Sequence, residues 1–216
     1  MLSIGIVGNG PEELLEDFRR FSEDIDIWIG ADRGALFLAR ENIYMQYAVG
    51  DFDSVSSEER QRIKQYSKHF QHHPEEKNET DLELALIIAY QLKPENIYLF
   101  GVTGGRLDHG LANIQQLYII RQKGIQGVIV DKQNRIEMFF PGTYEITKDK
   151  HYPYISFIPF SKKVEKLSLE GFYYPLKEAT ICWGSTRCIS NELLENSGTF
   201  SFQEGIVLVI KSRNVI

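Results

Sequence analysis

Strand-like and helix-like segments alternate over roughly the first 130 residues, and this alternation limits the possible folds more than any other feature of the sequence. Short apolar runs rich in Ile and Val are followed by longer segments with apolar residues at helical spacing. Such units predict a mainly parallel sheet with helices on both faces, a three-layer α/β/α domain. Strands are expected within residues 2–8, 25–34, 44–54, 95–105 and 126–133, and helices over 9–23, 34–43, 56–67, 80–92 and 106–124.

The pattern changes near residue 134. Shorter runs of alternating apolar and polar residues follow, broken by Gly, Pro and Asn, and no further long amphipathic helix is expected. These runs lie at residues 134–147, 152–161, 164–176, 179–192 and 205–212. They predict an antiparallel β-sandwich or a partial barrel. We place the boundary within 131–140, with an α/β domain over residues 1–133 and a β-sandwich domain over 134–216.

The composition excludes several classes of protein. A formal net charge of −6 argues against a general nucleic-acid-binding protein, because such proteins carry a basic face toward the phosphates. The N-terminal segment does not have the pattern of a signal peptide, and no run has the length needed to span a bilayer. Cys182 and Cys188 have no partners at metal-ligand spacing. We therefore expect reduced thiols, a cytoplasmic location, and neither nucleic acid nor membrane as a partner.

Two acids, Asp51 and Asp53, follow the apolar run that ends at Val49. In an extended segment they share one face while Phe52 takes the other. Two interpretations remain open: Asp53 or Ser54 caps the helix that follows, or the two acids hold a cation. Mg²⁺ favours the second, since it binds carboxylate oxygens together with water and substrate phosphates. Ligands of parallel sheets bind beyond the carboxyl ends of the strands, which is where these acids are expected.

Two further polar clusters occupy predicted helix starts. Thr80 and Glu83 have the spacing of a capping box, and Asp81 beside them stands at the positive end of the helix dipole, where it could face a metal. In "GVTGGRLDHG" the glycines allow backbone amides to approach a phosphate, and Arg106 can bind one in a bidentate way. A tight turn with a solvated arginine is the alternative for this segment.

Two common nucleotide-binding motifs are missing, and several other polar segments give no indication of function. The sequence has neither a G-x-x-x-x-G-K-[ST] loop nor a G-x-G-x-x-G pattern, which argues against a P-loop enzyme and a common dinucleotide-binding fold. "GNGP" at residues 8–11 is interpreted as a glycine turn only. His72 and His73 are expected in a loop, and His151 at the surface.

Taken together, the motifs resemble those of the bacterial thiamine pyrophosphokinase family. They are "GADRGA", "GDFDS", "KNETDLELAL", "GVTGGRLDH" with Asn113 following, "SLEGFYYPL" and "ISNE", and they cover nearly the whole chain in family order. One position departs from the family pattern, because Asn78 stands where an acid is usual. The resemblance implies a homodimer with active sites at the subunit interface, an α/β domain that holds ATP and Mg²⁺, and transfer of a pyrophosphoryl group from ATP to the hydroxyl of thiamine, leaving AMP.

The resemblance also assigns roles to individual residues. Asp51, Asp53 and Asp81 are expected to bind Mg²⁺ and to act in catalysis, with Asp32 near the substrate or metal. Asp81 or Asp108 would accept the proton of the thiamine hydroxyl, unless the metal lowers the pKa of that hydroxyl instead. The ATP-binding residues expected on this basis are Asp32, Thr80, Gly104, Gly105, Arg106, Asp108, His109 and Asn113.

The thiamine-binding residues are expected in the second domain. Ser190 and Asn191 match the thiamine-side motif of the family, although a polar turn would also explain them. Trp183, together with Tyr173 and Tyr174, is a candidate to stack on a cationic heteroaromatic ring. The alternative for these aromatic side chains is the core of the β-domain.

Two other functions remain compatible with the sequence. One is a metal-dependent nucleotidyl or glycosyl transferase that uses paired aspartates on the same scaffold. The other is a thiamine-binding regulatory protein without turnover, an interpretation that only Asn78 supports.

Overall fold

The chain forms two compact units, Met1–Lys132 and Gln133–Ile216. The structure is a computed structural model and describes residues 1–74 and 78–214. Lys77, the first residue of the "KNETD" motif, lies outside this range. Within the described chain, no helix combines the length and the apolar character needed to cross a membrane.

The first unit contains a parallel sheet with the strand order β4-β3-β2-β1-β5-β6. Its strands are β1 (Ser3–Val7), β2 (Ile27–Ala31), β3 (Met45–Gly50), β4 (Ser67–His72), β5 (Asn96–Phe100) and β6 (Gln126–Val130). In this order the chain moves outward from β1 to one edge and then crosses to β5. The carboxyl ends of β1, β2, β3 and β5 therefore lie side by side, which is where a doubly wound sheet binds its ligands.

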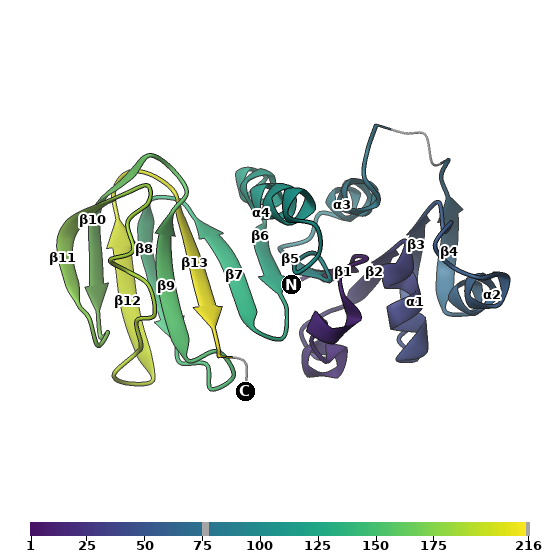
Figure 1. Ribbon diagram of the computed structural model, residues 1–216, viewed down its shortest axis with the longest axis horizontal. Helices are drawn as coiled ribbons and strands as arrows, with labels where there is room; N and C mark the ends of the chain where they lie inside the picture. Colours follow the sequence, from purple (N-terminus) through teal and green to yellow (C-terminus); the bar gives the residue numbers. More distant parts are fainter. Residues whose placement is uncertain (75–77, 215–216) are drawn as a thin grey trace. The chain divides into compact units, whose positions relative to one another are not determined.

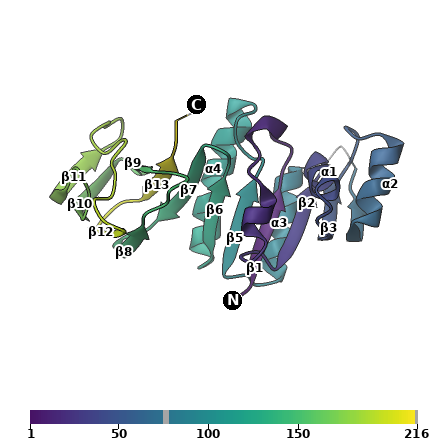
Figure 2. The same cartoon turned by 90° about the horizontal axis from the view of Figure 1, so that it is seen from below.

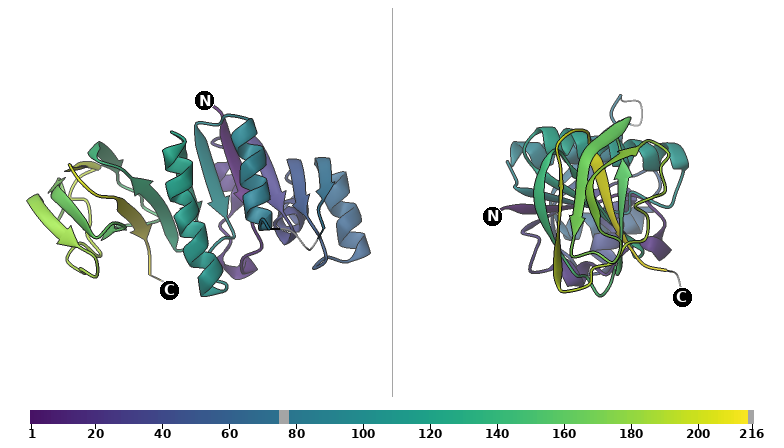
Figure 3. Two further views of the ribbon diagram at one scale, coloured as in Figure 1. Left: turned by 90° about the horizontal axis from the view of Figure 1, so that it is seen from above. Right: turned by 90° about the vertical axis from the view of Figure 1, so that its left-hand side faces the viewer.

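Four α-helices in the described part of the chain cover the sheet. They are α1 (Arg33–Arg40), α2 (Ser57–Gln65), α3 (Asp81–Gln91) and α4 (Leu107–Gln122), and α1 and α2 lie on one face while α3 and α4 lie on the other (Figure 1). The further views show the strands between these two helical layers (Figure 2, Figure 3). The three-layer α/β/α architecture predicted for this part of the chain is confirmed.

Local sequence signals set the starts of two helices. Ser56 and Glu59 form a capping box at α2, and Thr80 and Glu83 form another at α3, each with reciprocal hydrogen bonds between side chain and backbone. The capping box predicted at Thr80 is confirmed. The cap of α2 is Ser56, so the alternative in which Asp53 or Ser54 caps this helix is wrong.

The segment at residues 9–23 differs from its prediction. Instead of one helix it contains two short 3-10 helices, η1 (Glu12–Leu14) and η2 (Phe18–Phe21), with extended backbone at Leu15. Phe18 and Phe21 are three residues apart, a spacing that one 3-10 turn places on the same side. Both rings pack edge-on against Phe100 at 5.5 and 5.1 Å between centroids, so tertiary packing decides the conformation.

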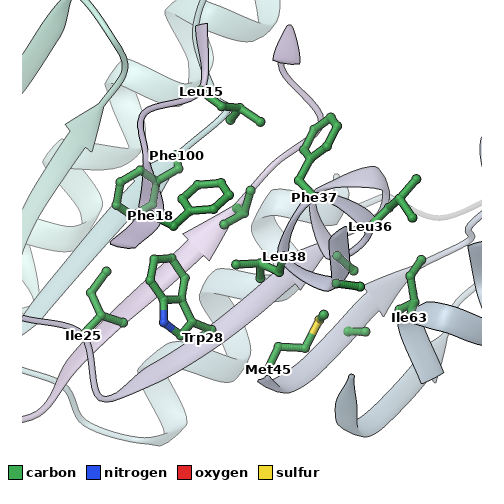
Figure 4. Packing of buried hydrophobic residues seen from close by; sticks show 14 of the residues in the cluster. Leu15, Phe18, Ile25, Trp28, Leu36, Phe37, Leu38, Met45, Ile63 and Phe100 are labelled. Carbon is green, nitrogen blue, oxygen red and sulfur yellow. The ribbon is translucent and has the colours of Figure 1, made fainter. Parts of the chain in front are cut away.

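One hydrophobic core of the first unit lies on the side of the sheet that α1 covers. Trp28, Phe18 and Phe100 contribute aromatic rings to it, and Leu36, Leu38 and other side chains of α1 pack over β1 to β3 (Figure 4). Gly34 permits the close contact of α1 with β1, because a Cβ at this position would lie 1.9 Å from the carbonyl oxygen of Val7. This close packing fixes the start of α1, and with it the residue before the helix, Asp32.

β4 is a strand that the sequence did not predict. The segment carries three cationic or imidazole side chains among six residues and reads as polar, but it pairs in parallel with β3 over Met45–Gly50. Its apolar residue, Phe70, stacks on Phe52 with 4.5 Å between ring centroids. Strand formation here depends on pairing with β3 and not on local propensity. The prediction that His72 lies in a loop is wrong, since it is the last residue of β4.

The second unit is a β-sandwich of two antiparallel sheets, as predicted. One sheet contains β7, β13 and β9, with β13 in the middle, and the other has the order β11-β10-β12-β8. The strands are β7 (Asn134–Phe139), β8 (Gly142–Thr147), β9 (Tyr154–Pro159), β10 (Lys163–Glu170), β11 (Leu176–Cys182), β12 (Ser197–Phe202) and β13 (Val207–Ser212).

The two sheets share one apolar core, to which Phe157 of β9, Leu169 of β10 and Phe200 of β12 contribute. β12 lies outside the predicted runs. Its inward residues are Gly198, Phe200 and Phe202, and the glycine at the first inward position obscures the alternation of apolar and polar residues.

Candidate active site

A pocket of about 380 Å³ opens at the carboxyl ends of β1, β2 and β5 in the first unit. Its lining comes from four separate segments: residues 8–10 after β1, Ala31 and Asp32 at the end of β2, residues 80–82 at the start of α3, and residues from Gly101 to Asn113 around the start of α4. Residues of the "GADRGA", "KNETDLELAL" and "GVTGGRLDH" motifs therefore contribute to one pocket.

Glycines bring two of these segments together. Gly10 donates a backbone hydrogen bond to the carbonyl oxygen of Gly101 over 2.7 Å, and a Cβ on Gly10 would lie 2.6 Å from that oxygen. Gly101 itself has a φ of +62°. Because side chains would separate the two loops, the glycines keep the wall of the pocket as bare backbone that a ligand can approach closely. The "GNGP" segment is thus part of the site and more than a turn.

Three carboxylates, Asp32, Asp51 and Asp53, offer oxygen atoms that all lie within 4.8 Å of one another. Asp32 follows β2, and the other two follow β3. These strands are parallel neighbours, so their carboxyl ends deliver the three side chains to the same place. Three carboxylate oxygens at this separation suit a hard divalent cation. The predicted metal group contained Asp81 in place of Asp32, and the structure gathers Asp32 instead.

Asp32 is the buried member of the group, with 6% of its surface exposed. Its Oδ2 accepts hydrogen bonds from Asn9 Nδ2 and Ser54 Oγ, each over 3.1 Å. Its Oδ1 is buried and has no hydrogen-bond partner among the described residues. A buried acceptor without a partner is costly, and a cation would relieve that cost. The residues present therefore fit a metal ion.

The electrostatic environment of Asp32 also favours a bound cation. Burial raises the pKa of Asp32, and the nearby negative charges of Asp81 and Asp51 raise it further. Asp32 also has φ of 47° and ψ of −121°, an unusual conformation for a residue with a side chain. A strained, crowded carboxylate at the edge of a pocket is typical of a functional site.

The turn after β3 directs Asp51 and Asp53. Gly50 and Phe52 both have positive φ, so the extended conformation predicted for residues 51–53 is wrong. Phe52 is fully buried and stacks on Phe70, and this contact holds the turn against the apolar core. Asp51 Oδ1 accepts a hydrogen bond from the backbone amide of Asp53 over 3.1 Å. Asp51 thus supports the turn and also contributes to the carboxylate group.

Asp81 lies in the pocket lining at the start of α3, next to Thr80. It is not a member of the carboxylate group defined above, although its charge acts on Asp32. Asn78, at the position where the family usually has an acid, is exposed.

The residues of the "GGRLDH" motif divide between the pocket and the surface. Gly105, Arg106, His109 and Asn113 belong to the lining, whereas Gly104 and Asp108 do not. Arg106 forms an exposed ion pair with Asp108, with 2.6 Å between Nη2 and Oδ2. This pairing lowers the pKa of Asp108. Asn113 Nδ2 donates to the carbonyl oxygen of Val102 over 2.8 Å and so ties α4 to the loop after β5.

The candidate thiamine-binding residues lie in the second unit. Asn191 is buried, and its side chain bonds to the backbone of Tyr174 at both N and O, over 3.0 and 2.8 Å. Ser190 is exposed and has a φ of +57°. Trp183 is 70% exposed, and Tyr173 and Tyr174 are exposed as well, so the alternative that placed these rings in the core is wrong.

Two polar residues of the site were missed in the sequence. Asn9 and Ser54 hold Asp32 through its Oδ2 atom. The only local signal for Asn9 was a polar side chain between two glycines at the end of the first strand. Ser54 belongs to the "GDFDS" motif and is otherwise predicted only as a possible helix cap. Neither role can be read from spacing, because each partner lies 22 or 23 residues away in the chain.

The first unit has a parallel α/β fold, and a carboxylate group and a glycine-lined pocket lie at the carboxyl ends of its strands. This arrangement is typical of enzymes that bind phosphate-bearing substrates at that edge of the sheet. Comparison with known proteins identifies the family. The family model for "Thiamin pyrophosphokinase, catalytic domain" matches residues 18–129, and the model for "Thiamin pyrophosphokinase, vitamin B1 binding domain" matches residues 143–207. The chain belongs to the thiamine pyrophosphokinase family.

Individual relatives agree with this assignment. The thiamine pyrophosphokinase of Bacillus subtilis (strain 168) is 46% identical over 212 residues, which are 98% of this chain and 99% of that protein. A crystal structure from Bacillus subtilis superposes with a TM-score of 0.93 at 45% identity, covering 99% of this chain and 100% of the other. One from Geobacillus thermodenitrificans gives 0.87 at 42% identity, covering 99% and 98%. At 19% identity the Candida albicans structure, with a TM-score of 0.80, shares the fold.

Proposed function

We propose that this protein transfers the pyrophosphoryl group of ATP to the hydroxyl of thiamine, giving thiamine diphosphate and AMP. Membership of the thiamine pyrophosphokinase family over nearly the full chain supports this activity. The observation in the structure that carries the proposal is the group of Asp32, Asp51 and Asp53 beside the glycine-lined pocket, with Oδ1 of Asp32 buried and lacking a partner in the described chain.

The carboxylate group would hold Mg²⁺, with Asp51 and Asp53 as accessible ligands and Asp32 as the buried one. Asp81, in the lining, would act on the ion directly or through water. When bound, Mg²⁺ neutralises charge on the phosphate oxygens of ATP and so eases attack by the alcohol. Asn9 and Ser54 keep the Asp32 carboxylate in one orientation.

The opposite wall would bind the nucleotide. Gly8, Gly10 and Gly105 keep this wall free of side chains, so that a phosphate can approach it closely, and Arg106 and His109 add donors at the start of α4. Phosphoryl transfer depends mainly on positioning and charge stabilisation, and this wall supplies both. The ion pair in the structure orients Arg106 through Asp108.

The proton of the thiamine hydroxyl needs an acceptor. Asp108 is paired with Arg106, and the lowered pKa of Asp108 makes it a weaker base. Asp108 also lies outside the pocket lining, whereas Asp81 lies within it. Both observations favour Asp81 over Asp108 for this role.

Thiamine would be bound by the second unit of a partner chain in a homodimer. Trp183 and Tyr173 expose their rings in the second unit and can stack on a cationic heteroaromatic group. Leu107 and Leu111 of α4 are exposed apolar residues one helical turn apart, which suits a protein interface.

Cys182 and Cys188 are free cysteines, consistent with a cytoplasmic protein.

One assay tests the proposal. The protein is incubated with ATP, Mg²⁺ and thiamine, and AMP and thiamine diphosphate are measured together; we expect both in equal amounts. Release of pyrophosphate in place of AMP would indicate a nucleotidyl transferase. Thiamine binding without either product would overturn the kinase activity in favour of a regulatory protein.

A further inference from the structure

One end of the β-sandwich in the second unit carries charged side chains where apolar ones are expected. In the antiparallel pair β7 and β13, Val207 lies opposite Phe139, Val209 opposite Glu137, and Lys211 opposite Arg135. Directly opposed residues share one face of a sheet, and residues two apart in a strand do so as well. Val207 and Val209 belong to the sandwich core. The side chains of Arg135, Glu137 and Lys211 therefore continue the inner face of this sheet.

Lys211 is a buried cation, with 9% of its surface exposed. Its Nζ donates a hydrogen bond to the carbonyl oxygen of Thr147 over 2.8 Å. A lysine ammonium has three donors, and burial of a charge is unfavourable unless the charge is paired and hydrogen-bonded. Burial, followed by the nearby charge of Arg135, lowers the pKa of Lys211.

The neighbours of Lys211 do not neutralise it fully. Arg135 is its direct partner across the strands, and like charges in that position repel. Glu137 binds Arg135, with 2.9 Å between Oε1 and Nε. Asp149 also faces Lys211, but its Oδ1 accepts hydrogen bonds from the backbone amides of His151 and Tyr152 over 2.8 and 3.4 Å. Two cations thus meet on the inner face, and Glu137 forms an ion pair with Arg135.

These side chains line a cavity of about 450 Å³, a size suited to a small ligand. Lys148 and Lys150 also belong to the lining, and cationic side chains outnumber acidic ones in it. Phe139 and Phe200 add an apolar surface on which the remainder of a small molecule can pack. Every residue of the lining belongs to the second unit, and none lines the pocket of the first.

We propose that this cavity binds a small molecule through a phosphate or carboxylate group that accepts hydrogen bonds from Lys211 and Arg135. An oxyanion placed there would use the remaining donors of Lys211 and would screen the repulsion between the two cations. The inference does not rest on the proposed activity, because the cavity contains none of the residues assigned to ATP, metal or thiamine.

The test compares thermal unfolding of the full chain in sodium phosphate, in sodium acetate and in sodium chloride at equal ionic strength, without ATP, thiamine or divalent cations. In the wild type, phosphate or acetate at several times its dissociation constant should raise Tm by about 3 °C over chloride. The two anions distinguish a phosphate from a carboxylate ligand. Lys211→Met, of similar length but without charge, should lose this rise. Lys177→Met, at an exposed position of β11, is the matched control and should keep it.

The outcomes separate binding from general effects. A rise of equal size in wild type and Lys211→Met would reflect salt exclusion or binding elsewhere and would overturn the proposal, as would no rise in the wild type. An NMR titration with inorganic phosphate gives an independent readout. Amide shifts centred on residues 135, 147 and 211 would support the site, and shifts confined to other residues would refute it. Arg135→Gln serves in place of Lys211→Met if the latter does not fold.

Discussion

The side-chain amide of Asn9 donates a hydrogen bond to Oδ2 of Asp32 over 3.1 Å, although 23 residues separate the two in the chain. Ser54 Oγ donates to the same oxygen over 3.1 Å. With Oδ2 occupied twice, Oδ1 is the atom of Asp32 that remains for a cation. The geometry of the proposed metal site thus depends on two neutral residues that would not bind the metal themselves, an arrangement typical of metal centres.

Replacement of Asn9 tests this arrangement. Asn9→Ala should weaken metal binding by about 10-fold to 100-fold, because Asp32 loses one of the bonds that orient it. Mn²⁺ titration followed by electron paramagnetic resonance measures the affinity without substrates. Ser54→Ala should act in the same direction, while circular dichroism reports an intact fold for both. Wild-type Mn²⁺ affinity in both variants would show that Asp32 needs no support.

Asp51→Asn tests the carboxylate group itself. The amide oxygen can still accept the hydrogen bond from the backbone amide of Asp53, so the turn should persist. The negative charge is lost, and formation of AMP should fall by orders of magnitude, about 10²-fold or more. Asp24→Asn, an exposed acid outside the pocket, is the matched control and should retain full activity. An active Asp51→Asn enzyme would refute the role of Asp51 as a metal ligand.

Replacing the cap residue in each of the two capping boxes should distinguish an effect on stability from an effect on activity. Ser56→Ala and Thr80→Ala each remove a cap from a helix and should each lower the free energy of unfolding by about 1 kcal/mol. Ser56 lies outside the pocket, so its replacement should leave kcat unchanged, whereas Thr80 lines the pocket. Urea unfolding and steady-state kinetics measure the two effects. Equal loss of activity in both variants would argue that Thr80 contributes through the helix alone.

Two glycines should respond in opposite ways to alanine. At Gly34 a Cβ would meet the carbonyl oxygen of Val7 at 1.9 Å, and we expect Gly34→Ala to destabilise the protein by about 3 kcal/mol or more. At Gly110, within α4, a Cβ would have no atom within 4 Å. Gly110→Ala should stabilise the protein by about 0.5–1 kcal/mol through the higher helix propensity of alanine. Denaturant unfolding measures both, and a neutral Gly34→Ala would contradict the close packing of α1 on β1.

The pH dependence of stability should report on Lys211. Its pKa is lower in the folded protein than its ordinary value of 10.5, mainly because of burial. Between the folded and unfolded pKa values the unfolded chain binds more protons, so this residue makes stability rise with pH in that interval. Lys211→Met should therefore be at least as stable as the wild type at pH 7, and its advantage should shrink toward pH 10. Urea unfolding at the two pH values, in chloride, decides the sign.

The sequence alone predicted the α/β/α layers, the β-sandwich and the capping box at Thr80. These features depend on periodicity and on contacts between residues three or four apart, which a sequence shows directly. It also indicated the acids at the end of β3, because parallel sheets bind ligands at that edge.

Only the tertiary structure decided the rest. The segment at residues 9–23 forms two 3-10 turns because Phe18 and Phe21 pack on Phe100, and β4 forms because β3 offers a pairing edge. Exposure of Trp183 depends on which face of the second unit is covered, a property that no local pattern contains.

The candidate site also combines features that the sequence predicts with features that only the tertiary structure determines. Local sequence determined that Asp32, Asp51 and Asp53 would each stand at the end of a strand. Their meeting within 4.8 Å, and the support of Asp32 by Asn9 and Ser54, depend on the order of β1, β2 and β3 in the sheet. Strand order brings residues from distant parts of the chain into contact, and it is fixed by the packing of the whole domain rather than by any short stretch of sequence.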